Sequence, residues 1–272
     1  MSELAIAVVV VCRDSEEAID ACLARLRAAE GVDEIRVVDC NSRDTTLAIV
    51  QRHALADARL RFIANPDDPG HGAACNQGVA ACRAPWLVLL DPGCLVEPDA
   101  LMHLRDLAAR DNAMVGADLV DEAGVREPAA RLGVSRVGAC GNWRRLGLEP
   151  VGVTAEELQD VAALSGDVMV LPRARFDALG GFDPGYATAL ANLDLCRRAR
   201  VAGMRIGCAN GVQTIRMRGQ VTRMQQMVMA WCRRLDASRY LWRNGPHSAL
   251  PIAWACLWSS LPWAVMRAML RR

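Results

Sequence analysis

The sequence contains no lysine, so its 32 strongly basic side chains are all arginines. We interpret this absence as a composition bias of the genome rather than as a functional choice. The chain also lacks internal repeats and low-complexity segments, which excludes a solenoid and a disordered polar chain. Its 272 residues are 52% hydrophobic and 23% charged, so the chain can bury the large core of a globular protein.

The eleven cysteines show no paired pattern. They lie singly along apolar segments, with no C-x-x-C pair and no histidines at matching spacing, and their number is odd. Residues 4–11 are apolar, but no basic stretch precedes them and Arg13 and Asp14 soon end the run, so we read no secretory signal there. We therefore expect reduced cysteines that act as small core hydrophobes in a cytoplasmic protein.

The charges are divided unequally along the chain. Residues 216–272 contain ten arginines and one acidic residue, so residues 1–215 are net acidic. Five of the seven tryptophans lie in the last 42 residues, where residues 249–266 form an uncharged stretch interrupted by two prolines. Such a stretch is near the lower limit for a membrane span, and tryptophans beside arginines suit a membrane–water interface. We expect a helix peripheral to the inner membrane, or else an ordinary packing helix or a homodimer contact, and no nucleic acid as partner.

Apolar runs alternate with helical patterns in the first third of the chain. Residues 4–12 (LAIAVVVVC) form a β-branched run that is typical of a strand buried on both faces. Helical spacing follows over residues 15–28, with Ser15 as a candidate N-cap. The same alternation predicts strands at residues 34–39, 60–64 and 85–90 and helices at 45–55, 72–81 and 98–110. This βαβ rhythm predicts an α/β fold with a mostly parallel sheet flanked by helices.

The rhythm loosens after residue 110. We expect a loop-rich insertion over residues 125–160, because it has five glycines, two prolines and no long periodic run. Further predicted elements are strands at 115–119, 168–171 and 205–209 and helices at 173–179 and 193–202. Residues 1–215 are thus expected to form one domain, and residues 216–272 a basic, tryptophan-rich helical extension.

Polar side chains follow the predicted strands at their carboxyl ends, where parallel α/β sheets bind their ligands. They are Arg13 and Asp14 after the first strand, Asp39, Ser42 and Asp44 at the end of the second, and Asp91 at the end of the fourth. An aspartate at such a place can accept hydrogen bonds from a base or a ribose. The alternative is that Asp39 and Asp91 are turn or helix-capping carboxylates.

Six segments, in order, resemble motifs of the family 2 glycosyltransferases, which are inverting enzymes with the GT-A fold. They are residues 39–45 (DCNSRDT), 65–78 (NPDDPGHGAACNQG), 90–93 (LDPG), 115–124 (VGADLVDEAG), 165–173 with 180–183 (SGDVMVLPR and GGFD) and 193–203 (LDLCRRARVAG). The resemblance covers about residues 5–215 and is strongest to the branch of rhamnosyl and other cell-envelope transferases. It implies transfer of a sugar from a nucleotide-sugar donor to a lipid-linked saccharide, in cell-envelope or exopolysaccharide synthesis.

The resemblance also implies roles for the matched positions. Asp39 would bind the base of the donor, in a pocket shared with Arg13, Asp14, Ser42 and Asp44. Asp91 would face the ribose, the sugar or a Mg²⁺ or Mn²⁺ ion that neutralises the departing diphosphate. The remaining matched positions would lie along the donor (Gly72 and Asn76) or shape the acceptor side (Gly181 and Asp183).

Three departures from the family pattern affect the chemistry. Gly93 stands where the second carboxylate of the metal motif is expected, and Asn192 stands at the position of the usual general base. An amide cannot take a proton near neutral pH. The histidine that the family often carries after the next strand is also absent, and Arg216 and Arg218 stand in that stretch instead. We expect each of the four histidines to be a surface or loop residue.

Two interpretations follow from these departures. In the first, the protein is a transferase that works without a metal: Arg216 or Arg218 stabilises the diphosphate, and Asp194 or Asp167 takes the acceptor proton. In the second, it is a glycosyltransferase-like binding or scaffolding protein that has lost turnover, because a base alone contributes about 10²–10⁴-fold to the rate. For Asp194, a carboxylate at a helix N-terminus is the alternative to catalysis.

Overall fold

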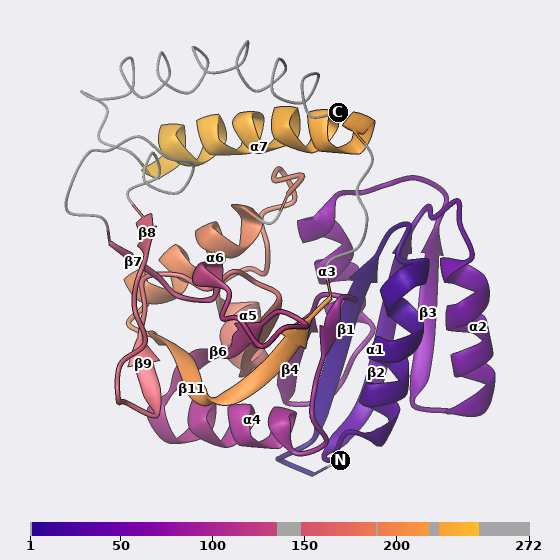
Figure 1. The fold of residues 1–272 in the computed structure, drawn as a ribbon, viewed down its shortest axis with the longest axis horizontal. Helices are drawn as coiled ribbons and strands as arrows, with labels where there is room; N and C mark the ends of the chain where they lie inside the picture. Colours follow the sequence, from indigo (N-terminus) through magenta and orange to yellow (C-terminus); the bar gives the residue numbers. More distant parts are fainter. Residues whose placement is uncertain (1, 135–147, 189, 218–222, 245–272) are drawn as a thin grey trace.

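The computed structural model describes residues 2–134, 148–188, 190–217 and 223–244 (Figure 1). Within them, a nine-stranded sheet has the order β3-β2-β1-β4-β10-β6-β11-β5, with β9 paired to β11, and β7 and β8 form a separate small sheet. The elements are β1 Ile6–Cys12, α1 Glu16–Ala28, β2 Val32–Cys40, α2 Thr46–Ala56, β3 Leu60–Asn65, α3 His71–Ala80, β4 Trp86–Leu90, β5 Cys94–Leu95, α4 Ala100–Asp111, β6 Ala113–Val120, η1 Pro128–Ala130, β7 Leu132–Val134, β8 Leu148–Pro150, β9 Leu158–Asp160, β10 Val168–Pro172, α5 Arg173–Ala178, α6 Leu190–Val201, β11 Arg205–Arg216 and α7 Arg223–Asn244.

The first four long strands are parallel and are joined by the helices that the sequence pattern predicts. The chain adds β2 and β3 on one side of β1 and then crosses to place β4 on the other side. The direction of winding therefore reverses between β1 and β4, and ligands of such sheets bind outside the carboxyl ends of the strands at this point. Strand β10 is antiparallel to both β4 and β6, which makes the sheet mixed.

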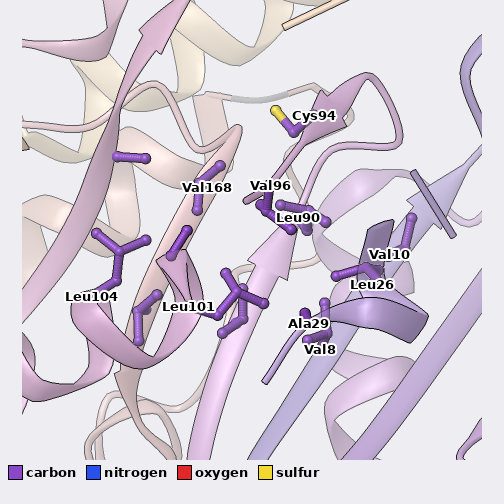
Figure 2. Packing of buried hydrophobic residues seen from close by; sticks show 14 of the residues in the cluster. Val8, Val10, Leu26, Ala29, Leu90, Cys94, Val96, Leu101, Leu104 and Val168 are labelled. Atoms are coloured by element: carbon purple, nitrogen blue, oxygen red, sulfur yellow. The ribbon is translucent and has the colours of Figure 1, made fainter. Parts of the chain in front are cut away.

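Helices cover both faces of the sheet, and the alternation of side chains along β1 serves both. Val8 and Val10 pack in one core with α1, α2 and α4, and Figure 2 shows them with Leu26 of α1 and Leu101 of α4. Ala7 and Val9, which alternate with them along β1, pack in the second core, under α3, α5 and α6. A strand buried on both faces must be apolar throughout, which explains the run of valines.

Several sequence-based expectations need correction. Helix α6 begins at Leu190, three residues before the expected start, so Asp194 is not in its first turn and its interpretation as a helix N-terminal carboxylate is wrong. Ser15 occupies the N-cap position of α1, but its side chain makes no capping hydrogen bond and bonds the main chain of Arg13 instead. His53 is buried, with Nε2 2.7 Å from Asp20 Oδ1, so it is not a surface residue.

Other expectations are confirmed within the described residues. The nine cysteines there are free, and eight of them are buried as small core side chains. Most predicted strands and helices are present, although β11 extends seven residues beyond its expected end and residues 125–160 contain short strands where we expected loop. Residues 135–147 of that insertion lie outside the described part of the chain.

Helix α7 packs against α6 on the side away from the sheet (Figure 1). The carboxylate of Asp236 accepts hydrogen bonds from the Thr188 N (2.7 Å) and from the Ala187 N (3.1 Å), which fixes α7 to the loop before α6. None of the helices in the described residues has the length and apolar character that a membrane span requires. The apolar stretch 249–266 lies outside the described residues, and the division at residue 215 stays a prediction.

Candidate active site

The loops after β1 and β2 are bonded to each other at the carboxyl edge of the sheet. The Asp14 N donates to Ser42 Oγ at 3.0 Å, and the Arg43 N donates to Asp14 Oδ1 at 2.8 Å. Asp14 and Asn41 both have positive φ, 46° and 60°, a conformation that aspartate and asparagine tolerate better than most residues. These loops hold Asp14 and Ser42 beside the end of β1.

Asp39 lies beneath these loops and is only 2% exposed. Its Oδ2 accepts from the Ser42 N at 3.1 Å and its Oδ1 from the Ser42 hydroxyl at 2.5 Å. The Cys12 thiol lies 3.7 Å from the same Oδ1. The contacts are those of a turn carboxylate, so Asp39 shapes the loop, and its binding of a base stays a prediction.

Two more residues expected near the base have structural partners. Asp44 accepts from the main-chain N of Glu16 (3.1 Å) and of Thr46 (2.9 Å), so it joins the starts of α1 and α2. Arg13 forms an exposed ion pair with Asp68. A bound anion could compete for Arg13 at little cost, because exposed ion pairs contribute only about 0–1 kcal/mol.

The ends of three strands meet on the other side of β1. The Asp91 N, after β4, donates to the Asp167 O, before β10, at 2.8 Å. The Met217 N, after β11, donates to the Gly93 O at 2.8 Å. Arg216 at the end of β11 forms an ion pair with Asp167, with 3.1 Å between Nη2 and Oδ1. Asp91, Asp167 and Arg216, which we call the strand-end triad, thus lie together. The sequence suggested one mechanism for Asp167 and Arg216, and the structure places Asp91 beside them.

The triad combines burial with opposite charges. Burial raises the pKa of Asp167, the charge of Arg216 opposes that rise, and the charge of Asp91 adds to it. Burial acts to lower the pKa of Arg216, but the charges of Asp167 and Asp91 outweigh it and raise this pKa. The guanidinium therefore stays charged beside two carboxylates, as a fixed cation at the edge of the sheet.

Gly93 leaves no room for the missing carboxylate. A Cβ at this position would lie 2.7 Å from the Met217 carbonyl oxygen and 3.1 Å from Asp91 Oδ1. The described residues also contain no group of three or more His, Cys, Asp or Glu side chains that could hold a metal ion. With one carboxylate ion-paired to Arg216, the remaining donors do not fit a divalent metal, and Asp91 as a metal ligand stays a prediction.

Asn192 occupies a tight position on α6. Its side chain is 2% exposed, and Nδ2 donates to the Ser165 O at 3.1 Å. Gly166 has φ 90°, and a Cβ on it would lie 1.7 Å from Asn192 Nδ2. A glycine at position 166 is therefore what admits the amide. Asp194, by contrast, pairs with Arg198 at 2.7 Å, and no contact in the described residues joins it to Asp167 or Arg216.

The residues expected to line the donor and the acceptor instead contact other parts of the protein. The Asn76 amide donates to the Phe182 O at 2.8 Å and accepts from the Phe182 N at 2.9 Å. A Cβ on Gly72 would lie 3.1 Å from the Asp183 O, and a Cβ on Gly181 2.7 Å from Asn76 Oδ1. The space beside Gly72 is therefore filled by protein rather than open to a donor. Asp183 pairs with two arginines of α7, Arg239 and Arg243.

The sequence analysis missed His71, the first residue of α3. Its ring lies edge-on to Phe182, with 6.1 Å between ring centroids, and Nε2 is 3.7 Å from Cys75 Sγ. Burial lowers the pKa of His71, while a side-chain hydrogen bond with Asn192 and the charge of Asp167 oppose the shift. His71 is thus a half-buried residue at the start of a helix rather than a loop residue. The available signal was its position between Gly70 and Gly72 in a motif assigned to the donor side.

A hollow of about 350 Å³ lies at the opposite edge of the sheet. It is lined by residues at the starts of β2 and β3, among them Glu34, Arg36 and Arg61, and by Arg83. None of the predicted site residues borders it.

Comparison with known proteins supports the resemblance. A model of the family described as glycosyl transferase family 2 matches residues 7–138. The succinoglycan biosynthesis protein ExoO of Rhizobium meliloti is 36% identical over 114 residues, which are 42% of this chain and 32% of that protein. An uncharacterized glycosyltransferase of Mycobacterium tuberculosis is 34% identical over 144 residues, 52% of this chain and 59% of the relative. The chain thus spans between about a third and three fifths of the length of these relatives.

Solved structures share the fold at low sequence identity. GalNAc-T7, solved with UDP, GalNAc and Mn²⁺, superposes with a TM-score of 0.66 at 16% identity and covers 79% of this chain and 44% of its own. The mannosyltransferase PcManGT of Pyrobaculum calidifontis, solved with GDP-Man and Mn²⁺, superposes with a TM-score of 0.59 at 17% identity, over 97% of this chain and 72% of its own. These similarities confirm the expected GT-A type of fold. The rhamnosyltransferase branch stays a prediction.

Proposed function

We propose that this chain, which carries a family 2 glycosyltransferase domain over residues 7–138, transfers a sugar from a nucleotide-sugar donor to a saccharide acceptor. The acceptor would be a lipid-linked saccharide of exopolysaccharide or cell-envelope synthesis. The observation that carries the proposal is the strand-end triad, which gathers a fixed cation and two carboxylates where a donor diphosphate would lie.

The place of the triad supports this assignment. Asp91 follows β4, and Asp14 and Ser42 follow β1 and β2, on the two sides of the point where the winding of the sheet reverses. A nucleotide across this point would place its base toward Asp39 and its diphosphate toward Arg216. Arginine suits a diphosphate because its planar guanidinium can donate two parallel hydrogen bonds to phosphate oxygens.

Arg216 would then supply the positive charge that a metal supplies elsewhere. The leaving nucleoside diphosphate gains negative charge as the sugar departs, and a fixed cation lowers the barrier without reorganising. PcManGT and GalNAc-T7 were solved with Mn²⁺, so a divalent ion is the alternative. We expect transfer that continues in EDTA, because Gly93 leaves no room for a second carboxylate.

A second candidate function is nucleotide-sugar binding without turnover. Two positions that depart from the family pattern favour it, because both are closely packed. Gly93 lies against the Met217 carbonyl oxygen, and the Asn192 amide lies against Gly166. A binding or scaffolding protein needs the triad but no base. Release of the nucleoside diphosphate from a donor separates the two functions.

Helix α7 supports a peripheral association with the inner membrane. Its exposed side chains include Val228 (54%), Leu235 (48%) and Trp242 (62%), and the exposed Arg233 lies near them in sequence. Apolar and aromatic side chains beside arginines suit the headgroup region of an anionic membrane. A cytoplasmic protein held at the membrane would meet lipid-linked acceptors. A vesicle-binding assay tests this association, and if no vesicles bind, a homodimer contact is the remaining role of the same helix.

The test uses the full chain and two measurements. Calorimetric titration with UDP, dTDP and GDP, in Mn²⁺ and in EDTA, measures binding. Release of nucleoside diphosphate from the corresponding sugar donors, with a lipid-linked saccharide fraction as acceptor, measures transfer. We expect binding and release in both buffers. Binding without release would establish the second function, and no binding of any nucleotide would overturn both.

A further inference from the structure

The hollow of about 350 Å³ at the amino ends of β2 and β3 is lined by four arginines. They come from three segments of the chain: Arg36 from β2, Arg59 and Arg61 from the start of β3, and Arg83 from the turn between α3 and β4. The lining contains two carboxylates, those of Asp33 and Glu34, so its net charge is positive. A hollow with an excess of one charge concentrates ions of the opposite charge.

Two of these arginines lie opposite each other on neighbouring strands. Arg36 and Arg61 are Cα partners in the parallel register of β2 and β3, so their side chains leave the same face of the sheet. Neighbouring strands are roughly 4.8 Å apart, and like charges directly opposite each other destabilise a sheet. An anion bound between the two guanidinium groups would remove this cost.

Arg36 is a buried, fixed cation that is only 8% exposed. Its Nη2 donates to Glu34 Oε2 at 2.8 Å and its Nε to the Ala81 O at 3.1 Å. Its Nη1 donates to the main-chain carbonyls of Ile35 and Arg59, both at 3.1 Å. The contact with the Ala81 O also covers the carbonyl end of α3, which would otherwise repel an anion. Within the described residues these contacts use at most four of the five N–H donors of the guanidinium, so one is left for a ligand.

Glu34 holds the turn after α3 against β2 without adding a free negative charge. Its Oε1 accepts from the Arg83 N and from the Ala84 N, both at 2.8 Å, and its Oε2 is balanced by Arg36. The place of Arg83 at the hollow is therefore fixed through its own main chain, which leaves its guanidinium available.

Arg61 and Arg83 supply the free cations of the hollow. Both are exposed, and in the part of the chain that the structure describes neither guanidinium has a hydrogen-bond or carboxylate partner. Arg59, by contrast, is balanced by an ion pair with a turn carboxylate at 2.7 Å. Asp33 is the carboxylate that opposes an anion, and its Oδ2 accepts from a main-chain N of β1 at 3.3 Å. Two free guanidinium groups thus face one carboxylate without an arginine partner.

We propose that this hollow binds a small anion with phosphate groups, at a site separate from the donor site. A planar guanidinium can donate two parallel hydrogen bonds to phosphate oxygens, so Arg61 and Arg83 would hold the anion against the buried Arg36. At about 3.3 Å per residue, β2 runs roughly 13 Å from Arg36 to Cys40 at its carboxyl end. The anion would therefore not overlap a nucleotide at the carboxyl edge, and the proposal does not depend on the proposed function.

The test is calorimetric titration of the full chain with inorganic pyrophosphate at low ionic strength. Arg61→Gln and Arg83→Gln each remove one free cation, and Arg197→Gln is the matched control because Arg197 is an exposed arginine of α6 outside the lining. We expect the dissociation constant to rise about tenfold or more in each hollow variant, as for a lost charge-assisted contact, and to stay within about twofold in the control.

The same titration separates the hollow from the strand-end triad. Pyrophosphate bound at Arg216 would not respond to Arg61→Gln or Arg83→Gln, whereas binding in the hollow should persist in Arg216→Gln. Native affinity in both hollow variants, an equal loss in Arg197→Gln, or no binding by the native chain would overturn the proposal.

A second arm distinguishes a free phosphate compound from a lipid headgroup. The starts of β2 and β3 lie at the end of the sheet away from α7 (Figure 1), so a membrane in contact with α7 would not reach the hollow. Sedimentation with phosphatidylglycerol vesicles should therefore be equal for the native chain and for Arg83→Gln, while only the native chain binds pyrophosphate tightly. Loss of vesicle binding in Arg83→Gln would identify the phosphate as that of a headgroup and overturn the free anion.

Discussion

The two halves of the carboxyl edge use aspartates in different ways. In the loops after β1 and β2, carboxylate oxygens accept hydrogen bonds from main-chain N–H groups and from Ser42; these carboxylates belong to Asp14, Asp39 and Asp44. After β4, β10 and β11, Asp167 pairs with the Arg216 side chain, whereas Asp91 accepts from the Gly93 N of its own turn at 2.8 Å and acts on both through its charge. The first half is a scaffold of turns, whereas the second concentrates charge.

The difference shows that an aspartate at a strand end is not by itself a functional residue. Asp167 differs from the other strand-end aspartates because it is balanced by a cation from a distant strand rather than by the backbone of its own loop. Arg216 is 49 residues from Asp167 in sequence and meets it only because β11 ends next to the turn after β4. The following predictions act on this contrast, from the largest expected effect to the smallest.

Removing the cation should have the largest effect. Arg216→Gln is expected to lower the rate of transfer by roughly 100-fold or more, because one fixed group opposite the developing charge is lost. Arg205→Gln is the matched control, since Arg205 begins the same strand, pairs with Asp160 and is similarly exposed. Equal rates in the two variants would contradict the assignment of the diphosphate to the triad.

Removing the scaffold carboxylate should act on binding. Asp39→Ala leaves the Ser42 N–H without its charged partner and is expected to weaken nucleotide affinity by about tenfold or more, the size of a lost charge-assisted hydrogen bond. Asp57→Ala removes a turn carboxylate that accepts from the Arg59 N at the other edge of the sheet, and serves as the control. An unchanged nucleotide dissociation constant in Asp39→Ala would show that the base of the nucleotide binds elsewhere.

Restoring the family carboxylate should not restore a metal site. Gly93→Asp forces a Cβ to within 2.7 Å of the Met217 carbonyl oxygen, so we expect a loss of about 1–3 kcal/mol in the free energy of unfolding. Gly211→Ala, where a Cβ meets nothing within 4 Å, should change it little. Full stability together with a new requirement for Mn²⁺ in Gly93→Asp would show that the turn is more adaptable than its packing indicates.

The smallest expected effect is on the free energy of unfolding at acid pH. Because the pKa of His71 is lowered on folding, the unfolded chain binds its proton at higher pH than the folded chain does. The contribution of neutral His71 to stability is therefore complete at a pH above the ordinary histidine pKa. It is lost as the pH falls toward the pKa of the folded state, by at most about 1.4 kcal/mol per pH unit. Urea unfolding between pH 5 and 7.5 should show a smaller loss of stability in His71→Gln than in the native chain. A parallel loss in both would contradict the lowered pKa.

The sequence predicts the scaffold well because it is local. The valine run of β1 and the apolar spacing of α1 follow from burial on two faces and one face, and both agree with the structure. Strand-end aspartates follow from the same pattern, so Asp39 and Asp91 are found at the expected edge. The early start of α6 was missed because a helix boundary depends on packing rather than on periodicity.

The charges and amides of the site are predicted less well because their partners are distant in sequence. Asn76 bonds Phe182 across 106 residues, and the His71 ring meets Phe182 only when α3 packs against the loop before α6. Family motifs identify such positions without saying whether they face a ligand or each other. Asp194 is the clearest case, since its motif suggested a base and its contact is the ion pair with Arg198.

The most direct test of the account is the affinity of a nucleoside diphosphate for the native chain and for Arg216→Gln, measured by calorimetry in EDTA. The account predicts binding by the native chain without any divalent ion and a dissociation constant at least about tenfold higher in the variant, as for a lost charge-assisted contact. Binding that requires Mn²⁺ and is the same in both chains would contradict it.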